Sequence, residues 1–293
     1  MKMKITKFKV FSGLAIVVMA VVSIYTYVLA VAPAMVTDNF DDSSKIASST
    51  SVAVASGVVA LSAASSWTCG SSLVDSRDAQ TYATILIGTQ CWMAANLNIG
   101  IKITSCTNGY AGVCTTGGDT VKNQGTACAL SDGSDIQKYC YSDTAGNCTT
   151  YGGLYQWNQA MCGSPTEGVQ GICPTGWHIP TDAEQYTLEN YLKGVGQTCD
   201  ANRSGTYDCS PAGSHLSNYT LNHDNSSGFS ALLAGYRRAD GSFSNLTSYT
   251  FFWSSLQSSS SNAWSRYLGS GYATVYRYAG DKARGFSVRC LKN

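Results

Sequence analysis

The chain has 293 residues, of which 13% are charged, and its formal net charge is +1. Four lysines lie within the first nine residues, so the remainder carries a net charge of about −3 and shows no basic patch of the kind that favours nucleic acid. Aromatic residues make up 11%, which excludes disorder throughout the chain. Abundant Gly, Ser, Thr, Asn and Tyr favour a turn-rich, strand-rich extracellular fold.

Residues 1–36 have the pattern of an export segment. The basic stretch MKMKITKFK precedes Val10–Val36, which contains no charged residue. This run is long enough for a signal peptide, whose apolar region spans about 7–15 residues, or for a membrane-spanning helix, which needs about 20. Ala32 and Ala34 offer a cleavage site, and Pro33 between them breaks a helix. We expect an N-terminal hydrophobic helix, either cleaved near Ala34 or retained as a membrane anchor, with the lysines in the cytoplasm and the rest exported.

Residues 37–66 form a Ser-, Ala- and Val-rich segment. Its stretch SVAVASGVVALS alternates as a short hairpin does, with a turn near Ser56. Three acidic residues of this segment are candidate calcium ligands: Asp38, Asp41 and Asp42. They lack the regular ligand spacing of a calcium loop. The segment is therefore interpreted as a stalk or spacer with some strand character.

All twelve cysteines follow the export segment. An even number of cysteines in an exported chain favours disulfides. Structural zinc usually needs C-x2-C pairs, and the sequence contains none, so no metal is expected. Spacing alone leaves the pairing open, although the short loops Cys140–Cys148 and Cys199–Cys209 are plausible local bridges.

From Trp67 onward the pattern becomes that of a folded domain. Gln80–Gly88 alternates as a strand, and CWMAANLNIG follows a Gly-Thr turn. Residues 102–150 are rich in Cys, Gly and Thr and are expected to form a disulfide-tied loop region. Gly152–Met161 has apolar residues at both helical and strand spacing, so its structure is left open.

The stretch GICPTGWHIPTDAE contains the start of a helix. Thr181 and Glu184 form a capping box, in which each side chain bonds the backbone N–H of the other residue. The helix is expected to continue to Gly194, which stops it. Its candidate buried residues are Ala183, Tyr186, Leu188, Tyr191 and Leu192.

The histidines do not form a recognisable catalytic or metal motif. His178 stands between two apolar residues of an expected strand, and we interpret it as a structural histidine. His215 and His223 lack zinc spacing, and no nucleophile elbow, H-E-x-x-H or phosphate loop occurs. No catalytic residue and no cofactor is therefore predicted, and the chain is not expected to be an enzyme.

The C-terminal third is expected to consist of short strands separated by turns such as Asp240-Gly241. The predicted strands are GFSALLAGYR (228–237), TFFWSS (250–255), AWSRYLG (263–269), ATVYRY (273–278) and GFSVRCLK (285–292).

Six stretches occur in a characteristic order: QTYATILIGTQCWMAANLN, YGGLYQWNQAM, GICPTGWHIPTDAE, GFSALLAGYR, FFWSS and GFSVRCLK. Together they resemble the Fibrobacter succinogenes major paralogous domain family of surface and secreted bacterial proteins, over about Cys69–Asn293. That family resembles the C-type lectin-like fold, including the branch shared with formylglycine-generating enzymes. The resemblance implies an α+β domain over residues 67–293, with short antiparallel strands, one or two helices and long disulfide-tied loops.

The resemblance also bears on one disulfide and on the chemistry. In that fold a cysteine near the first helix pairs with one in the last strand, which implies a Cys173–Cys290 bridge. Calcium-dependent sugar-binding members carry Glu-Pro-Asn or Gln-Pro-Asp and then Trp-Asn-Asp, and none of these tripeptides occurs here. The paired active-site cysteines of the formylglycine enzymes match no motif of this chain. Calcium-dependent sugar binding is therefore not implied, and a calcium-free sugar site stays possible.

The segment Tyr236–Arg284 is dense in Tyr, Ser, Gly, Asn and Arg, a composition typical of adaptable binding surfaces. We predict an exported, non-enzymatic binding or adhesion module for an extracellular glycan or protein. A core role for Trp253, Trp264 and Phe286, with Tyr and Ser on exposed strands, is the plainer interpretation. The candidate ligand contacts are Tyr236, Arg237, Arg238, Tyr249, Tyr267, Tyr272, Tyr276 and Tyr278.

Three alternatives remain open from the sequence. The first is a structural component of the cell envelope that is hardened by disulfides. The second is a binding protein whose surface residues are varied by a retroelement. An enzyme acting on envelope polysaccharide is the third alternative. Glycosidases usually need two carboxylates about 5–10 Å apart, and the few acids here form no evident pair.

Overall fold

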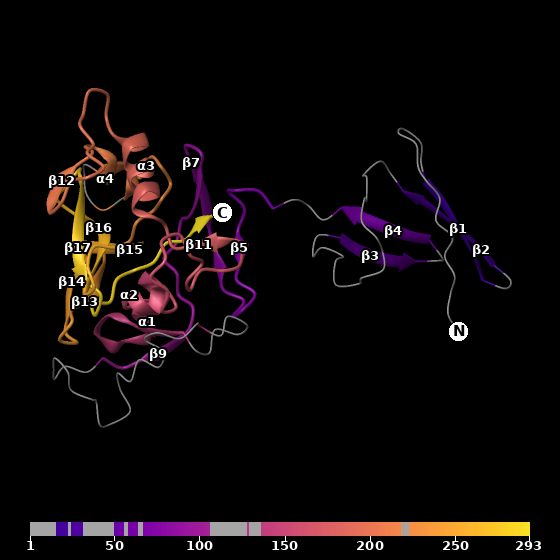
Figure 1. The fold of residues 1–293 in the computed structure, drawn as a ribbon, viewed down its shortest axis with the longest axis horizontal. Helices are drawn as coiled ribbons and strands as arrows, with labels where there is room; N and C mark the ends of the chain where they lie inside the picture. The colour runs from indigo at the N-terminus through magenta and orange to yellow at the C-terminus, as the bar shows by residue number, and fades with distance from the viewer. Residues whose placement is uncertain are drawn as a thin grey trace. The chain divides into compact units, whose positions relative to one another are not determined.

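The computed structural model describes residues 16–22, 25–31, 50–55, 58–63, 67–105, 128, 136–217, 219 and 223–293. The chain divides into two compact units, Met1–Thr68 and Cys69–Asn293. Strands dominate and helices are few, so the described protein is of the mixed α+β class (Figure 1).

The first unit contains two antiparallel strand pairs. They are β1 (Ile16–Val22) with β2 (Tyr25–Val31), and β3 (Thr50–Ala55) with β4 (Val58–Ala63). The structure thus places strands where the sequence predicted a hydrophobic helix, because the β-branched and aromatic residues of IVVMAVV and YTYVLAV favour extended backbone. Among the described residues, no helix is long and apolar enough to cross a membrane. Export and cleavage near Ala34 remain predictions.

The pair β3–β4 agrees with the hairpin expected in the spacer, since Ala55 lies opposite Val58. The three aspartates considered as calcium ligands, Asp38, Asp41 and Asp42, lie outside the described residues.

The second unit contains a four-stranded and a six-stranded sheet (Figure 1). The antiparallel four-stranded sheet has the order β11 (Trp177–His178), β18 (Leu291–Lys292), β8 (Gln90–Met93), β7 (Thr84–Ile87). The six-stranded sheet has the order β12 (Thr206–Asp208), β17 (Val275–Asp281), β16 (Asn262–Gly269), β15 (Tyr249–Gln257), β13 (Ala234–Arg237), β14 (Phe243–Leu246). Only the pair β13–β15 is parallel within these two sheets.

Two smaller strand pairs also lie among the described residues of this unit. They are β5 (Leu73–Val74) with β6 (Thr81–Tyr82), antiparallel, and β9 (Ile101–Ile103) with β10 (Gln137–Tyr139), parallel. The single strand predicted for Gln80–Gly88 is therefore interrupted at Ala83, because β6 and β7 pair with different partners.

The helices are short. In the described part of the chain they are the 3-10 helix η2 (Tyr141–Asp143), α1 (Ala145–Tyr151), α2 (Trp157–Ala160), α3 (Asp182–Leu192) and α4 (Ala212–Leu216). Gly152–Met161, for which the sequence left helix and strand open, contains both: Leu154 and Tyr155 form β-bridges, and the helix α2 follows.

Two hydrophobic clusters lie on the two faces of the six-stranded sheet. On one face Phe251 and Trp253 of β15 pack with Phe286, whose ring centroid lies 4.2 Å from that of Trp253. On the other face Phe252 packs with Leu188 of α3 and with residues of α4. Successive residues of a strand point to opposite faces, so β15 contributes to both clusters. The plainer interpretation of Trp253 and Phe286 as core residues is confirmed.

The predicted capping box of α3 is confirmed. The Thr181 hydroxyl accepts from the Glu184 backbone N–H at 3.1 Å, and a Glu184 carboxylate oxygen accepts from the Thr181 N–H at 2.8 Å. The predicted buried face is only partly correct: Leu188 is buried, whereas Ala183 is exposed and Tyr191 is 63% exposed.

The buried face of α3 carries charged residues instead. Asp182 accepts from Arg266 at 2.6 Å and from Arg277 at 3.0 Å, while Glu189 pairs with Arg266 and Arg203. Burial acts to raise the pKa of Asp182, but attraction to Arg266 and the hydrogen bonds from both arginines outweigh it, so its pKa is lowered. The arginines of β16 and β17 thus explain why the helix turns carboxylates toward the sheet.

Five disulfides lie among the described residues, and none of the described cysteines is free. They join Cys69 to Cys91, Cys128 to Cys162, Cys140 to Cys148, Cys173 to Cys290, and Cys199 to Cys209. The two local bridges and the long-range bridge implied by the resemblance are all among them.

His178 on β11 has a structural role. Its Nδ1 lies 2.7 Å from the Asn293 Oδ1, and its Nε2 lies 2.9 Å from a Glu184 carboxylate oxygen. The hydrogen bond with Glu184 raises the pKa of His178, burial opposes this, and the bond with Asn293 adds to the rise. His178 therefore ties the start of α3 to the C-terminal residue of the chain.

This contact predicts a pH-dependent contribution to stability. Because the pKa of His178 is raised by folding, its contribution is complete below the unfolded value of 6.5 and is lost as pH rises through the folded value. Replacing His178 with Gln is expected to reduce the free energy of unfolding more at about pH 5.5 than at about pH 8.5, by up to about 1 kcal/mol. Urea unfolding of both proteins at the two pH values measures this. Equal losses at both values would show that the histidine acts only as a neutral hydrogen-bonding group.

Candidate ligand-binding surface

A row of tyrosines crosses one edge of the six-stranded sheet, where β12, β17 and β16 lie side by side (Figure 1). In the strand register Tyr207 lies opposite Tyr276, and Tyr276 lies opposite Tyr267. Tyr267 in turn lies opposite Phe251 of β15. Residues opposite one another in a ladder share a face of the sheet, so these four rings are displayed together.

Two further tyrosines join this row. Tyr249 begins β15, and its ring centroid lies 5.7 Å from that of Tyr267. Tyr272, in the turn between β16 and β17, stacks on Tyr207 with centroids 4.5 Å apart and rings inclined by 17°. We call the resulting group the tyrosine platform: Tyr207, Tyr249, Tyr267, Tyr272 and Tyr276.

The rings of the platform hold one another in place. Tyr267 and Tyr276 stack with centroids 4.4 Å apart, and Tyr207 packs edge-on against Tyr276 at 4.6 Å. The hydroxyls of Tyr267 and Tyr207 are hydrogen-bonded at 3.0 Å. At its inner end the platform meets the core, since the ring centroids of Tyr267 and Phe251 lie 5.0 Å apart. Such contacts fix the rotamers of aromatic residues before any ligand arrives.

The platform is uncharged. Burial raises the pKa of Tyr207, and the hydrogen bond with Tyr267 and the neighbouring Tyr272 raise it further. Burial also raises the pKa of Tyr249, with a contribution from Tyr272. The pKa of Tyr267 is raised by burial despite its hydrogen bond with Tyr207. These phenols therefore stay neutral at physiological pH and well above it.

The platform is only partly open to solvent. Tyr272 is 41% exposed, and the other four tyrosines are half-buried. This combination of a fixed inner ring set and an accessible outer ring is suited to contact with a ligand.

Four of the eight predicted contact residues lie in the platform: Tyr249, Tyr267, Tyr272 and Tyr276. Tyr278 is half-buried on β17 two residues after Tyr276, and its ring centroid lies 6.5 Å from that of Tyr267. Arg238 is exposed at the end of β13, where a guanidinium nitrogen lies 3.3 Å from the Ser244 Oγ. These two residues are accessible but do not belong to the stacked group.

Two predicted contacts are wrong because the side chains are buried. Tyr236 is 8% exposed and packs against Phe251 with centroids 4.8 Å apart. Arg237 is 2% exposed, donates to the Ser105 Oγ at 2.7 Å and lies over the Tyr139 ring. The prediction rested on composition, which does not reveal that all four residues of β13 are buried.

Tyr207 was missed by the sequence reasoning. It lies in a Cys-bounded stretch, Cys199–Cys209, that gives little strand signal, and β12 has only three residues. Only the pairing of β12 with β17 brings it beside Tyr276.

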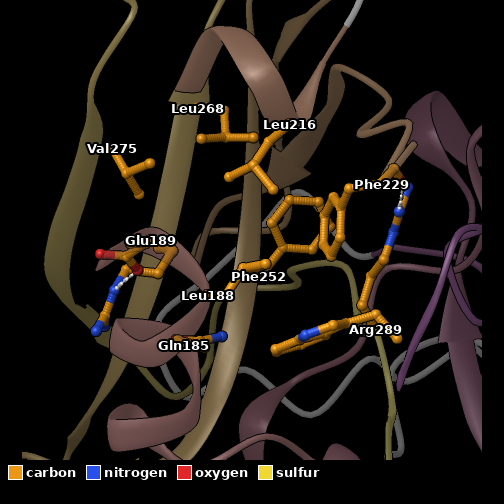
Figure 2. A pocket seen from close by; sticks show the side chains of 11 residues that line it. Gln185, Leu188, Glu189, Leu216, Phe229, Phe252, Leu268, Val275 and Arg289 are labelled. Carbon is orange, nitrogen blue, oxygen red and sulfur yellow. Dashed lines mark hydrogen bonds and ion pairs between the residues drawn. The ribbon is translucent and has the colours of Figure 1, made fainter. Parts of the chain in front are cut away.

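A small cavity lies behind the sheet, on the face opposite the platform, between α3, α4 and the strands. Figure 2 shows Leu216, Leu268 and Phe252 around it, with Glu189 on one side and Arg289 on the other. Its volume is about 30 Å³, room for a water molecule or two but not for a sugar or peptide. It is therefore a packing feature and not a ligand site.

Arg289 at this cavity is fully engaged with the protein. It donates to the Asn96 Oδ1 at 2.8 Å and to the Ser230 carbonyl at 2.7 Å, and it lies over the Phe229 ring. Burial lowers its pKa to about 9. The residue thus ties the C-terminal segment to the loop before β13.

Two further groups contain the residue types of a metal site and of a proton relay, but they lack the geometry that either site needs. Glu189, Cys199 and Cys209 lie close together, but the two cysteines are joined in a disulfide and so offer no thiolate to a metal. His215 shares a single nitrogen, Nδ1, between Asp224 at 3.0 Å and Ser226 at 2.7 Å. A proton relay needs the acid and the nucleophile on different ring nitrogens, so this group does not match one.

Comparisons with known proteins place the chain in a family. No match was found among curated proteins or among solved structures. The family model described as the Fibrobacter succinogenes major domain matches residues 85–292. The matched range includes the six-stranded sheet, the Cys173–Cys290 bridge and every tyrosine of the platform. The chain therefore belongs to the Fibrobacter succinogenes major domain family.

Proposed function

We propose that this protein is an exported cell-surface or secreted binding module without enzymatic activity, and that it contacts its extracellular ligand through the tyrosine platform. The observation that carries the proposal is the platform itself, in which five tyrosines from four strands and the turn between β16 and β17 converge at one edge of a sheet. Tyrosine supplies large, rigid and amphipathic contact area at a low cost in conformational entropy.

An extracellular location fits the cysteine chemistry. Disulfides persist in oxidising compartments and are rare in the cytosol, and five join described parts of this chain. The expected export segment at residues 1–36 supports the same location. The C-type lectin-like fold belongs to this proposal too. Its support is the bridge between Cys173, which precedes β11 and α3, and Cys290, just before β18.

Binding is expected to be independent of calcium, because the sequence lacks the calcium-binding tripeptides of sugar-binding lectins. The test is an array of extracellular glycans, envelope polymers and surface proteins, probed with the full-length chain in calcium and in chelator. We expect capture by at least one polymer or protein, with equal signal in both buffers.

The platform's role is tested on the same array with Tyr272→Ala/Tyr276→Ala. We expect the signal to fall at least about tenfold, since aromatic residues of this kind are typical hot spots. The matched control is Tyr191→Ala, which removes a tyrosine that is 63% exposed on α3. A blank array for the wild type would contradict the proposal and favour a structural envelope component, which self-assembly of the purified protein would then support.

A further inference from the structure

We infer that the platform binds a neutral polysaccharide chain, whose sugar rings lie flat against the outer tyrosines. This inference rests on the proposed function and names the class of ligand. It follows from the charge, the size and the hydrogen-bonding groups of the platform.

The charged groups nearest the platform are engaged elsewhere. Arg266 and Arg277 alternate with Tyr267 and Tyr276 along their strands, so they point to the opposite face and pair with Asp182. Asp208, beside Tyr207, accepts from the Thr198 hydroxyl at 2.7 Å and from the Asp200 N–H at 2.6 Å.

At the margin of this face, the Arg284 guanidinium lies 5.7 Å from the Tyr278 ring centroid. An acidic polymer would lose its hydration at the platform without gaining an ionic partner there. The charge distribution therefore favours an uncharged ligand.

The exposed area is small. A stable protein partner usually covers about 800 Å² on each side of an interface. Among the large exposed hydrophobic residues of the described chain, Tyr272 is the only one in the platform. The others are Trp67, Val74, Leu86, Ile101, Tyr191 and Val195. Little of the platform's apolar surface is therefore exposed, which favours a narrow chain over a folded protein as the ligand.

The platform's chemistry matches that of a sugar ring. A pyranose has an apolar C–H face and a rim of hydroxyls, and a tyrosine has an apolar ring face and one hydroxyl that can both donate and accept. In the stacked pairs Tyr207–Tyr272 and Tyr267–Tyr276 each ring covers one face of its partner, so the opposite face or the ring edge is left for a sugar. One sugar can therefore lie on exposed Tyr272, and its neighbours along the chain can contact the edges of half-buried Tyr207 and Tyr276, without reordering the rings.

The test is calorimetric titration of the full-length protein with defined hexasaccharides. Four probes are neutral: the β-1,4-linked hexamers of glucose, mannose and xylose, and the α-1,4-linked hexamer of glucose. The hexamer of galacturonic acid is the anionic probe. We expect at least one neutral hexamer to bind, no binding of the anionic hexamer, and little change in the neutral affinity between 50 and 500 mM salt.

Variants separate stacking from hydrogen bonding. We expect Tyr272→Ala to weaken neutral binding at least tenfold and Tyr272→Phe to weaken it less than threefold, because the phenylalanine ring keeps the stacking face. Tyr191→Ala is expected to leave the affinity unchanged. Thermal unfolding of each variant shows whether it is folded, and exposed Tyr272 is not expected to affect the melting temperature strongly.

The outcomes also separate this inference from the proposed function. If none of the neutral hexamers binds, or if galacturonate binds better, the neutral-polysaccharide inference is overturned. The proposed function survives that result if another ligand from the array still depends on Tyr272. If no ligand depends on Tyr272, both are contradicted.

Discussion

Replacing Glu189 with Gln is expected to lower the free energy of unfolding by about 3–5 kcal/mol, because it leaves buried arginine charge uncompensated. Glu189 is 1% exposed, and one of its oxygens lies 2.5 Å from the Arg266 Nε. The other oxygen bonds Arg203, which is 4% exposed. In the variant, Asp182 would remain as the partner of Arg266 and Arg277, and Arg203 would lose its carboxylate. Urea unfolding of the wild type and the variant measures the difference.

The matched control is Asp224→Asn. Asp224 pairs with His215 at 3.0 Å, but its side chain is 57% exposed, so its loss is expected to cost less than about 1 kcal/mol. If Glu189→Gln costs no more than Asp224→Asn, the buried network does not stabilise the packing of α3 on the sheet.

Removing the Cys173–Cys290 bridge is expected to produce the second large effect. The two cysteines are 117 residues apart and fully buried. The chain-entropy relation assigns about 5 kcal/mol to a loop of that length. The double variant Cys173→Ala/Cys290→Ala should therefore unfold at a much lower urea concentration and a lower temperature than the wild type.

The bridge Cys140–Cys148 provides the comparison. Its cysteines are also buried but only 8 residues apart, and the same relation gives about 2.5 kcal/mol. Removing the long bridge should thus lower the free energy of unfolding about twice as much as removing the short one. Equal losses would show that local packing of the sulfurs, and not closure of the long loop, determines the contribution.

Local signals in the sequence predicted local structure well. The capping box of α3 depends on four consecutive residues, and the structure contains both of its hydrogen bonds. The short bridges Cys140–Cys148 and Cys199–Cys209 likewise depend on nearby residues. The family resemblance, carried by ordered motifs, supplied the one long-range pairing, Cys173–Cys290.

Features that depend on distant partners were harder to predict. The buried face of α3 was expected to be apolar, but arginines more than seventy residues away hold Asp182 and Glu189 inside. One local signal failed as well: the apolar run Val10–Val36 was expected to be a helix on hydropathy, whereas β1 and β2 within it pair as strands.

The candidate site likewise combines features that the sequence reveals with features that depend on strand pairing. Composition singled out the segment Tyr236–Arg284, and four of the predicted contacts in it belong to the platform. Tyr236 and Arg237 were misplaced because β13 is buried on both faces. Tyr207 was missed because its neighbours are brought to it only by strand pairing across the sheet.

The central claim is that the tyrosine platform is the surface that contacts the ligand. Hydroxyl-radical footprinting of the full-length protein, with and without the polymer that it binds most tightly on the array, tests this directly. We expect oxidation of Tyr207, Tyr272 and Tyr276 to fall several-fold on binding and that of Tyr191 to stay unchanged. Protection of Tyr191 or of another surface, with Tyr272 oxidised as before, would contradict it.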